Sequence, residues 1–581
     1  MTCEAVKSLL RWVPIIALAL AINSAATAFG ATADGGDFEE LRVLYEWSKL
    51  DYEWPDDSTK ARALSMGQFI PENNALAGIK VWGERVFLSV PRWREGVPAT
   101  LATVPAFPQG GYASPKLRPF PSWEMQGVGN CSALQNIRSM EVDTMGRLWA
   151  LDAGRVNTAS LRSDDRCPPK LVIFDLVSGY KMIHKYIFPP NVASSESSFL
   201  SDIVLDGSAS GGAQPDNWYA YISDSGDASI IVYSMKEDRS WRVQDVGSMR
   251  ADPSARDLYV AGERVNLMDG SSGGGIDGLA LAPVRHGSRY LYYSPLASYH
   301  VYALPTDLLR DSNSDSRGVS GAVIDLGRRR SQGRGMVMDE RGILYFGLLA
   351  QNAIARWNST NSTSNNFSPG GYNQYGVGAG FGNFGGPGYS TEDPRRPYDP
   401  SIRGRNLGGA FDGVLRRGSL EGSQVIISAD DKLLQWPDTL AFDSTGNLWL
   451  TSNRLQNFLN GRVNLDEPNY RVIRGFTGTK SYLYGDGSDA RWSSGLGRGM
   501  NNSPGGRDDR RWGGSDNDDT RGTWNGRDDP DDRNRPYFGS STANPHYSST
   551  YRPINGISES SRSCATILSV IITSITAFYL C

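Results

Sequence analysis

Five polar side chains stand where short apolar segments begin or end, places where a β-rich fold can gather reactive groups. The five are Asp202, Asp224, Asp277, Asp438 and Asn453. Carboxylates that converge in a water-poor pocket attract an ammonium group, and the attraction grows as water is excluded. The alternative for each residue is structural, because Asp and Asn often cap turns or tie neighbouring elements together. The pattern predicts a binding site for a small amine, weighed against that structural role.

Proton-transfer catalysis is the second chemistry to consider, and histidine is its usual agent. The histidines are His184, His286, His300 and His546. None has a triad partner beside it, and the chain has no H-E-x-x-H, G-x-S-x-G or metal-spaced histidine pair. One calcium ion held by Asp202, Asp277 and Asn453 is a further alternative, since calcium prefers oxygen ligands. The sequence therefore predicts no cofactor and no metal, and it leaves any catalytic residue unknown.

A repeated motif shows which elements must position these groups. SMEVDTMGRLWALDAGR (139–155) and WPDTLAFDSTGNLWLTSNR (436–454) share D-x-x-G-x-L-W in one register, and GMVMDERGILYFGLL (335–349) is a third copy. Asp suits the first position of a turn and Gly the last, so each copy predicts a hairpin between two short strands. Asp143, Asp339 and Asp443 are therefore assigned to turns and left out of the site.

Looser copies of the same plan fill the gaps between these three. The first strands are expected near residues 76, 137, 201, 276, 335 and 438. Six units of this kind predict an all-β fold, a six-bladed β-propeller over residues 38–480 in which each blade has four antiparallel strands. Coincidence among Gly-rich segments is the alternative, and a seventh blade would have to lie within the Gly-rich insert at 361–410, which looks unsuited to strands.

The chain's 581 residues carry a net charge of −4, with 21% charged residues, so no basic footprint for nucleic acid is present. Lys7, Arg11 and an apolar stretch followed by small residues predict a signal peptide at 1–28, with an uncleaved anchor as the alternative. Cys131 and Cys167 are the only cysteine pair in the body of the chain, and they are expected to form a disulfide after secretion. Four sequons predict glycosylation at Asn130, Asn358, Asn361 and Asn366.

The C-terminal part has a different composition. Residues 481–562 are rich in Gly, Asp, Arg and Ser, and this predicts a disordered tail, either a solvated spacer or a segment that adheres to an extracellular matrix. Residues 563–581 are apolar and flanked by cysteines, typical of a discarded glycolipid-anchor signal, with a true membrane span as the alternative. The predicted location is extracellular, with a possible tether to the membrane.

Several segments together resemble the insect yellow / major royal jelly protein family. They are the run from LRVLYEWSKLDYEWPDD to LATV (41–104), CPPKLVIFDL (167–176), YISDSGDASIIVY (221–233), SPLASYHVYALP (294–305), YFGLLAQNAIARWN (345–358) and LWLTSNR (448–454). The resemblance covers roughly residues 40 to 480 and implies a secreted six-bladed propeller.

The resemblance also implies a range of functions. Family members serve melanin pigmentation, cuticle or eggshell, feed larvae, or bind biogenic amines, and a few are similar to dopachrome-converting enzymes. In the amine-binding relatives the last blade supplies much of the pocket, so Asp438 and Asn453 are the residues that carry over best, with Phe458 or Tyr299 facing a catechol ring. A shared fold cannot choose among these functions. We therefore expect a catecholamine-like ligand at the channel mouth, with a dopachrome-converting isomerase and a non-catalytic matrix protein as alternatives.

Overall fold

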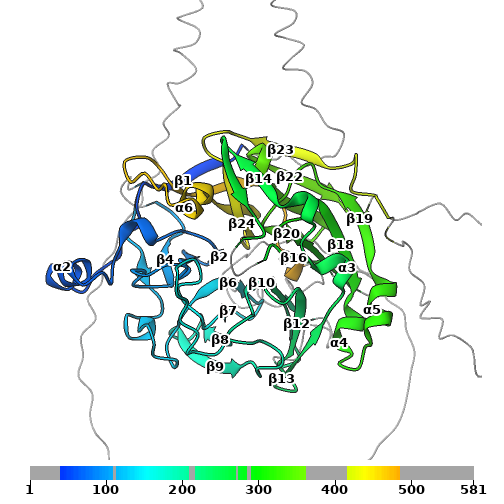
Figure 1. Cartoon of the computed structure of the whole chain (residues 1–581), viewed down its shortest axis with the longest axis horizontal. Helices are drawn as coiled ribbons and strands as arrows, with labels where there is room; N and C mark the ends of the chain where they lie inside the picture. Colours follow the sequence, from blue (N-terminus) through cyan, green and yellow to red (C-terminus); the bar gives the residue numbers. More distant parts are fainter. Residues whose placement is uncertain are drawn as a thin grey trace, which may run out of the picture. The chain divides into compact units, whose positions relative to one another are not determined.

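The computed structural model describes residues 40–108, 113–207, 216–269, 273–283, 289–360, 415 and 417–484. Within them, six four-stranded antiparallel sheets form a ring around a central channel (Figure 1). The predicted all-β, six-bladed propeller is confirmed. The expected signal peptide, the insert, the tail from residue 485 onward and the C-terminal apolar segment lie outside the described residues. The first residues of the tail, 481–484, were predicted to be disordered, but they include a 3₁₀ helix, Tyr482–Tyr484, in which Tyr482 and Leu483 are buried.

Each sheet is one blade, and the blades are numbered I to VI along the chain. From the channel outward, blade I has β2 (Ile79–Trp82), β3 (Arg85–Ser89), β4 (Leu101–Pro105) and β5 (Arg118–Pro119), and blade II has β6 (Ile137–Val142), β7 (Arg147–Asp152), β8 (Lys170–Asp175) and β9 (Lys181–Ile187). In the same order, blade III has β10 (Leu200–Asp206), β11 (Tyr219–Asp224), β12 (Ser229–Ser234) and β13 (Arg239–Val243), and blade IV has β16 (Ile276–Leu281), β17 (Tyr290–Pro295), β18 (His300–Pro305) and β19 (Ile324–Arg328). Blade V has β20 (Met336–Met338), β21 (Ile343–Leu348), β22 (Ala353–Asn358) and β23 (Val425–Ala429), and blade VI has β24 (Trp436–Phe442), β25 (Asn447–Asn453), β26 (Tyr470–Phe476) and β1 (Arg42–Trp47).

Short elements connect and decorate the blades. A hairpin of β14 (Asp257–Val260) and β15 (Glu263–Asn266) lies between blades III and IV in sequence. The described α-helices are α2 (Asp57–Ser65), α3 (Val246–Met249), α4 (Thr306–Arg310), α5 (Ser316–Ala322) and α6 (Leu455–Leu459). Helix α2 projects from the ring (Figure 1). No helix among the described residues is long and apolar enough to span a membrane.

The ring closes between the two ends of the propeller. Strand β1 pairs antiparallel with β26, with Trp47 opposite Tyr470, so the N-terminal strand becomes the outer strand of the last blade. Figure 1 shows β1, in blue, beside the gold strands of blade VI. Hydrogen bonds across this junction hold the two ends together and remove the unpaired edge that β26 would otherwise present.

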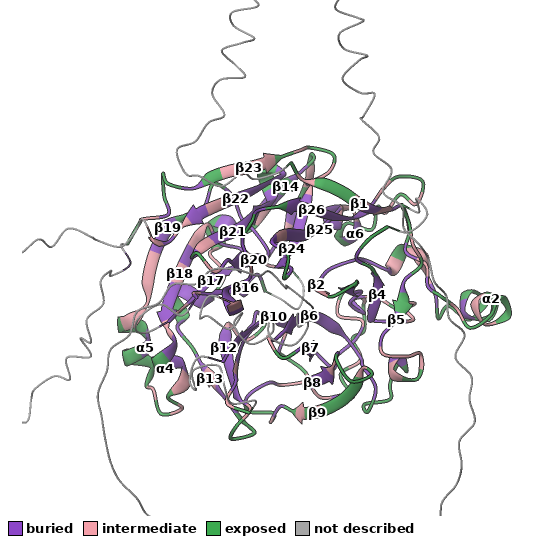
Figure 2. Ribbon diagram, turned by 180° about the vertical axis from the view of Figure 1, so that it is seen from behind, coloured by how far each residue is buried: buried purple, intermediate pink, exposed green. Residues whose placement is uncertain are grey.

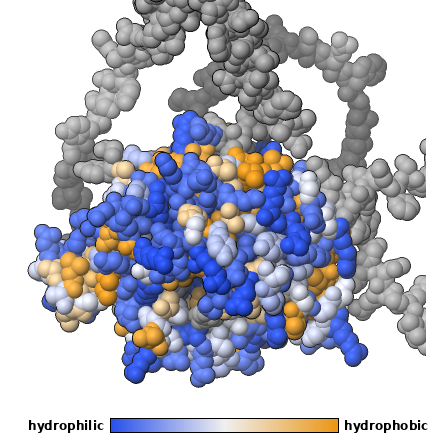
Figure 3. Space-filling view, turned by 45° about the horizontal axis from the view of Figure 1, so that its top comes forward, coloured by the Kyte–Doolittle hydropathy of each residue, from blue (hydrophilic) through white to orange (hydrophobic). Residues whose placement is uncertain are grey.

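Inner strands are buried on both faces, whereas outer strands such as β9 and β23 are half-buried or exposed. Every residue of β6 and β7 is buried, but β9 exposes Met182, Ile183 and Ile187 (Figure 2). Burial on both faces explains why apolar residues stand next to one another in the inner strands, as at Ile203, Val204 and Leu205. On the face drawn in Figure 3 the surface is mainly hydrophilic, and hydrophobic residues form small separate patches.

The D-x-x-G motif forms the turn between the first and second strands of blades II, V and VI. The Oδ1 of Asp443 accepts hydrogen bonds from the backbone N–H groups of Thr445 and Asn447, at 2.8 and 2.9 Å. Gly446 has a φ of 91°, a conformation that favours glycine. The Oδ2 of Asp443 accepts the indole N–H of Trp449 at 2.8 Å. The motif tryptophan therefore stabilises the carboxylate that starts the turn.

Cys131 and Cys167 are joined by a disulfide across a sequence separation of 36 residues. The bond lies in blade II, where it ties the segment before β6 to the residues that lead into β8. Asn130, beside it, is exposed. Asn358 is half-buried at the end of β22, where its Oδ1 accepts the backbone N–H of Thr360 at 2.9 Å. The other two sequons, at Asn361 and Asn366, lie outside the described residues.

Candidate functional site

β-bulges at the start of the first strands aim polar side chains into the channel. Arg138, Asp277 and Asp438 are each skipped in the pairing of their blade's first two strands, between Ile137 and Ser139, between Ile276 and Gly278 and between Pro437 and Thr439. Asp202 lies in the corresponding irregularity of blade III. An unpaired bulge residue is turned out of the ladder. Four blades thus contribute one charged residue each to the same end of the channel.

Blade V contributes Arg334, which comes just before β20 and joins two of the carboxylates. Its Nη1 lies 2.8 Å from Oδ1 of Asp438, and its Nε lies 3.4 Å from Oδ2 of Asp277. All three side chains are buried. Burial raises the pKa of Asp438, although the charge of Arg334 opposes that rise. Burial alone would lower the pKa of Arg334, but the two carboxylates outweigh it and raise that pKa above its usual value.

Arg138 is the second cation of this group, and two of its nitrogen atoms have no hydrogen-bond acceptor among the described residues. Its guanidinium carbon lies 3.8 Å from the centre of the Phe199 ring and 5.7 Å from that of Trp93. Its Nε and Nη1 are buried and have no hydrogen-bond partner among the described residues. Burial lowers the pKa of Arg138 to about 9, and the charge of Arg334 acts in the same direction. Unmet buried donors are costly, so they call for an acceptor, either a ligand or water.

Asp202 lies in the same channel and links three blades. Its carboxylate accepts the hydroxyl of Ser139 at 2.8 Å and the backbone N–H groups of Ile203 and Leu279 at 2.9 and 3.0 Å. Burial raises the pKa of Asp202 to about 6, against the lowering effect of these donors. A carboxylate with this pKa exchanges its proton near neutral pH.

Asp224 and Asn453 occupy a different place, at the ends of the second strands. Asp224 accepts the backbone N–H of Phe199 at 2.8 Å. Asn453 donates to the carbonyl of Leu76 at 2.9 Å and accepts the N–H of Leu455 at 2.9 Å. Asn453 reaches Asp438 only at 3.5 Å. The structure therefore brings Asp277 and Asp438 together, puts Asp202 in the same channel, and engages the other two predicted residues in backbone contacts. A ligand-binding role for any of the five stays a prediction.

The described histidines lie on outer parts of the blades. His184 is on β9, with Nε2 at 2.9 Å from the hydroxyl of Tyr233. His300 begins β18, and its Nδ1 lies 3.0 Å from both carboxylate oxygens of Asp325. His286 and His546 lie outside the described residues. Among those described, no group of three or more His, Cys, Asp or Glu is placed to hold a metal ion.

The opposite end of the channel is closed by residues 477–484, here called the closing segment. The hydroxyl of Tyr482 accepts the backbone N–H of Leu205 at 2.9 Å, and Lys480 accepts the N–H of Glu340 through its carbonyl at 2.9 Å. The space left between Tyr482 and Asp202 is about 10 Å³.

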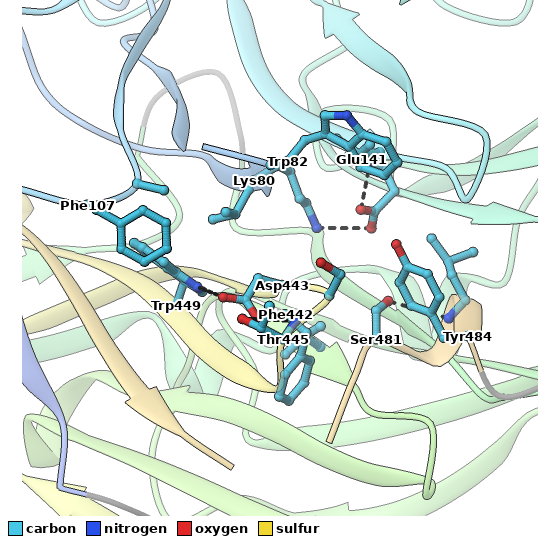
Figure 4. Close-up of a pocket in the computed structure, with 17 residues that line it drawn as sticks. Lys80, Trp82, Phe107, Glu141, Phe442, Asp443, Thr445, Trp449, Ser481 and Tyr484 are labelled. Atoms are coloured by element: carbon cyan, nitrogen blue, oxygen red, sulfur yellow. Dashed lines mark hydrogen bonds and ion pairs between the residues drawn. The ribbon is translucent and has the colours of Figure 1, made fainter. Parts of the chain in front are cut away.

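A small pocket of about 60 Å³ lies beside the closing segment (Figure 4). Lys80 and Glu141 form an ion pair in it at 2.9 Å, and Trp82, Phe107 and Tyr484 contribute aromatic rings around it. Both charges of the pair are nearly buried and satisfied by each other, so the pocket offers little free charge for recognition.

Sequence reasoning missed Arg138, Arg334 and Tyr482, yet the first two had a signal. Arg138 and Arg334 stand five residues before the motif aspartates of blades II and V, as Asp438 does in blade VI. Aligning the three copies backwards from the turn therefore finds all three channel residues. Tyr482 has no counterpart in the repeat, because it follows the last strand.

Known proteins with similar sequences identify the family of this chain. The family profile described as Major royal jelly protein matches residues 137–369 and 419–479. Protein yellow of Drosophila erecta is 30% identical over 436 residues, covering 74% of this chain and 68% of that protein, and Protein yellow of Drosophila melanogaster has the same identity and coverage. Among solved structures, a virginiamycin B lyase from Staphylococcus aureus overlaps 71% of this chain and 82% of its own, at a TM-score of 0.32 and 8% identity, which is too loose to bear on function. With its profile match and its likeness to the yellow proteins, the chain belongs to the major royal jelly protein family.

Proposed function

We propose that this protein is a secreted member of the yellow group that binds a small catechol-bearing amine at the end of the channel that carries Arg138, in the service of pigment, cuticle or eggshell formation. The observation that carries the proposal is the buried cluster of Arg138, Arg334, Asp277 and Asp438, in which Arg138 keeps two unmet donors. Secretion is supported by the Cys131–Cys167 disulfide, since such bonds persist in oxidising compartments.

The cluster suits a ligand that carries both a cation and ring oxygens. An ammonium group would approach Asp438 and Asp277, which share a single arginine. Hydroxyl oxygens on the ring would accept from Nε and Nη1 of Arg138, whose guanidinium is held against Phe199. Because the site is buried, each of these contacts is stronger than it would be in water. Arg334 already satisfies part of the carboxylate charge, so the ligand's oxygens matter as much as its ammonium.

A dopachrome-converting isomerase is the second candidate, and one observation favours it. Asp202 is buried in the channel with a pKa of about 6, which suits a general base near neutral pH. Dopachrome carries a carboxylate, which would meet the free donors of Arg138. Binding alone and isomerisation therefore predict the same pocket and differ only in turnover.

Calorimetry on the secreted full-length protein tests the proposal. Dopamine and dopa should bind to the parent protein. Asp438→Asn and Arg138→Gln should each lower the affinity for dopamine at least tenfold. Lys181→Gln, on the exposed outer strand β9, is the matched control and should bind normally. Thermal melts show whether each variant is folded. Failure of the folded parent to bind either compound would overturn the proposal, and loss of dopachrome absorbance on mixing would replace simple binding with isomerisation.

A further inference from the structure

A second cavity, separate from the channel, lies on blade I beside helix α2. Its volume is about 480 Å³, within the range of small-molecule sites, roughly 300–1,000 Å³. It is lined by α2, by the turn at residues 92–98 and by the segment from Trp123 to Val128. The proposed channel ligand uses none of these residues.

One wall of the cavity is a fixed pair of indole rings. Trp54 and Trp123 stack with their centres 4.9 Å apart and their planes at 27°. Each indole N–H already donates within the protein, that of Trp54 to Asp51 Oδ1 and that of Trp123 to the carbonyl of Glu53, both at 3.1 Å. With their polar edges satisfied and both rings half-buried, the two indoles present rigid apolar surfaces. Such surfaces favour contact with another flat ring.

Arginines predominate among the charged residues of the lining. Arg62, Arg92 and Arg94 line the cavity against a single carboxylate, Glu95. Arg92 is buried and donates to backbone carbonyls only, including those of Val97 and Pro98 at 2.9 Å. Within the described part of the chain, none of the three arginines forms a salt bridge.

The charge of Arg92 is poorly screened by water because its side chain is buried. Burial lowers the pKa of Arg92 to about 10, so the guanidinium stays protonated at neutral pH in a poorly hydrated place. Arg94 is held over the ring of Phe458 at 4.4 Å and donates to the Phe458 carbonyl at 2.7 Å. Two fixed cations and the exposed Arg62 therefore give the cavity an unbalanced positive potential, which favours an anion.

From these features we infer that the cavity is a second ligand site, specific for a small organic anion with a flat ring, such as an aromatic carboxylate or sulfate. The indole pair supplies the ring surface and the arginines supply the counter-charge. The preference is opposite to that of the channel, whose carboxylates favour an ammonium. The two sites share no lining residue, since neither Arg138 nor any of the channel carboxylates lines the cavity.

The probe for this site is 2-naphthoate, titrated into the full-length secreted protein and followed by calorimetry and tryptophan fluorescence. Three comparison compounds separate the contributions: 2-naphthylmethylammonium has the ring with the opposite charge, cyclohexanecarboxylate has the charge without a flat ring, and N-acetylglucosamine is an uncharged sugar. We expect 2-naphthoate to bind and each comparison compound to bind at least tenfold more weakly.

Two variants locate the site. Arg62→Gln changes an exposed side chain, so the variant should fold normally, and its affinity for 2-naphthoate should fall severalfold. Trp123→Leu should lower the affinity for 2-naphthoate at least tenfold. Arg250→Gln, another exposed arginine outside the cavity lining, is the control and should leave binding unchanged. Asp438→Asn should also leave 2-naphthoate binding unchanged, which separates this site from the channel. Equal binding by the parent and Arg62→Gln, or stronger binding of the sugar, would overturn the inference.

Discussion

At the scale of single residues, two later positions of the repeat determine how well the carboxylate at its first position is hydrogen-bonded. In blade VI the indole of Trp449 donates to Oδ2 of Asp443. Blade V has Tyr345 at the equivalent position, and Oδ2 of Asp339 has no hydrogen-bond partner among the described residues. Burial accordingly raises the pKa of Asp339 to about 6, despite two backbone donors. Asp443 Oδ2 also accepts from the side chain of Asn447 at 2.8 Å, and blade V has Ile343 at that position. Two changes in the motif therefore leave Oδ2 of Asp339 without the donors that Asp443 has.

Replacing the motif tryptophan should therefore destabilise the protein through the turn. Trp449→Phe leaves Asp443 with one donor fewer and, because a phenyl ring is smaller than an indole, leaves a cavity at a buried position. We expect a loss of about 2–4 kcal/mol in the free energy of unfolding. Tyr345→Phe is the matched control, because no hydrogen bond joins that side chain to its turn aspartate, and it should cost less than Trp449→Phe. Urea denaturation of the three proteins measures both, and equal losses would contradict this account.

The raised pKa of Asp339 has a consequence for pH dependence. Its folded-state pKa, about 6, lies above the ordinary value of 3.8. The protonated form is therefore favoured by folding, so its contribution to stability is complete below pH 4 and is lost as pH rises through 6. Asp339→Asn removes this titration, keeps an oxygen for the backbone donors, and should stabilise the protein at pH 7 by about 1–3 kcal/mol.

Denaturation at pH 4.5 and at pH 7 checks this sign. The difference in stability between Asp339→Asn and the parent should be larger at pH 7 than at pH 4.5. Asp443→Asn, whose parent carboxylate is fully hydrogen-bonded, should instead destabilise at both. A smaller difference at the higher pH would show that Asp339 is not the group that titrates.

At the scale of elements, the closing segment matters most, because it shuts one end of the channel with a single tyrosine. Tyr482 is buried and its hydroxyl is the acceptor for Leu205 N–H. We expect Tyr482→Phe to cost about 1–2 kcal/mol by leaving that N–H unmet, and Tyr482→Ala to cost about 3–5 kcal/mol by adding a cavity. Amide hydrogen exchange at Leu205 should speed up in both variants, and unchanged exchange would mean that the segment does not protect the strand.

The elements also show how far sequence reasoning reaches. First strands were expected near 76, 137, 201, 276, 335 and 438, and they begin at 79, 137, 200, 276, 336 and 436. Buried inner strands and Asp–Gly turns leave a strong local pattern, so the blades are readable. The channel residues leave a weaker local pattern. A bulge breaks the alternation of inward and outward side chains at each of them, and the sign of their charge differs, as between Arg138 and Asp438. Tyr482 and the cavity beside α2 depend on contacts between distant segments, which no local pattern records.

At the scale of the whole molecule, the pairing of β1 with β26 holds the ring closed. Deleting Arg42–Trp47 would expose the whole edge of β26 and the buried face behind Trp47. We expect such a protein to lose its single cooperative melt and to associate through the free edge. Val43→Ser, a change at an exposed residue of the same strand, is the control and should stay monomeric. Size-exclusion chromatography measures the association and a thermal melt measures the cooperativity of unfolding. A deletion variant that stays monomeric and melts cooperatively would show that β1 is not needed to close the ring.

The same closure determines the order in which the blades can be completed during synthesis. Asn469 donates to the carbonyl of Ser48 across 421 residues of sequence, so β1 has no partner strand until almost the whole propeller has been synthesised. Before that it can contact only blade I, where Trp47 donates to the carbonyl of Pro115 at 2.8 Å. At about 5–20 residues per second, the growing chain carries this unpaired strand for roughly 20–80 s. Blades I to V have time to form as each emerges, whereas blade VI must wait for translation to deliver β26. The last event in building this molecule is therefore the capture of its first strand.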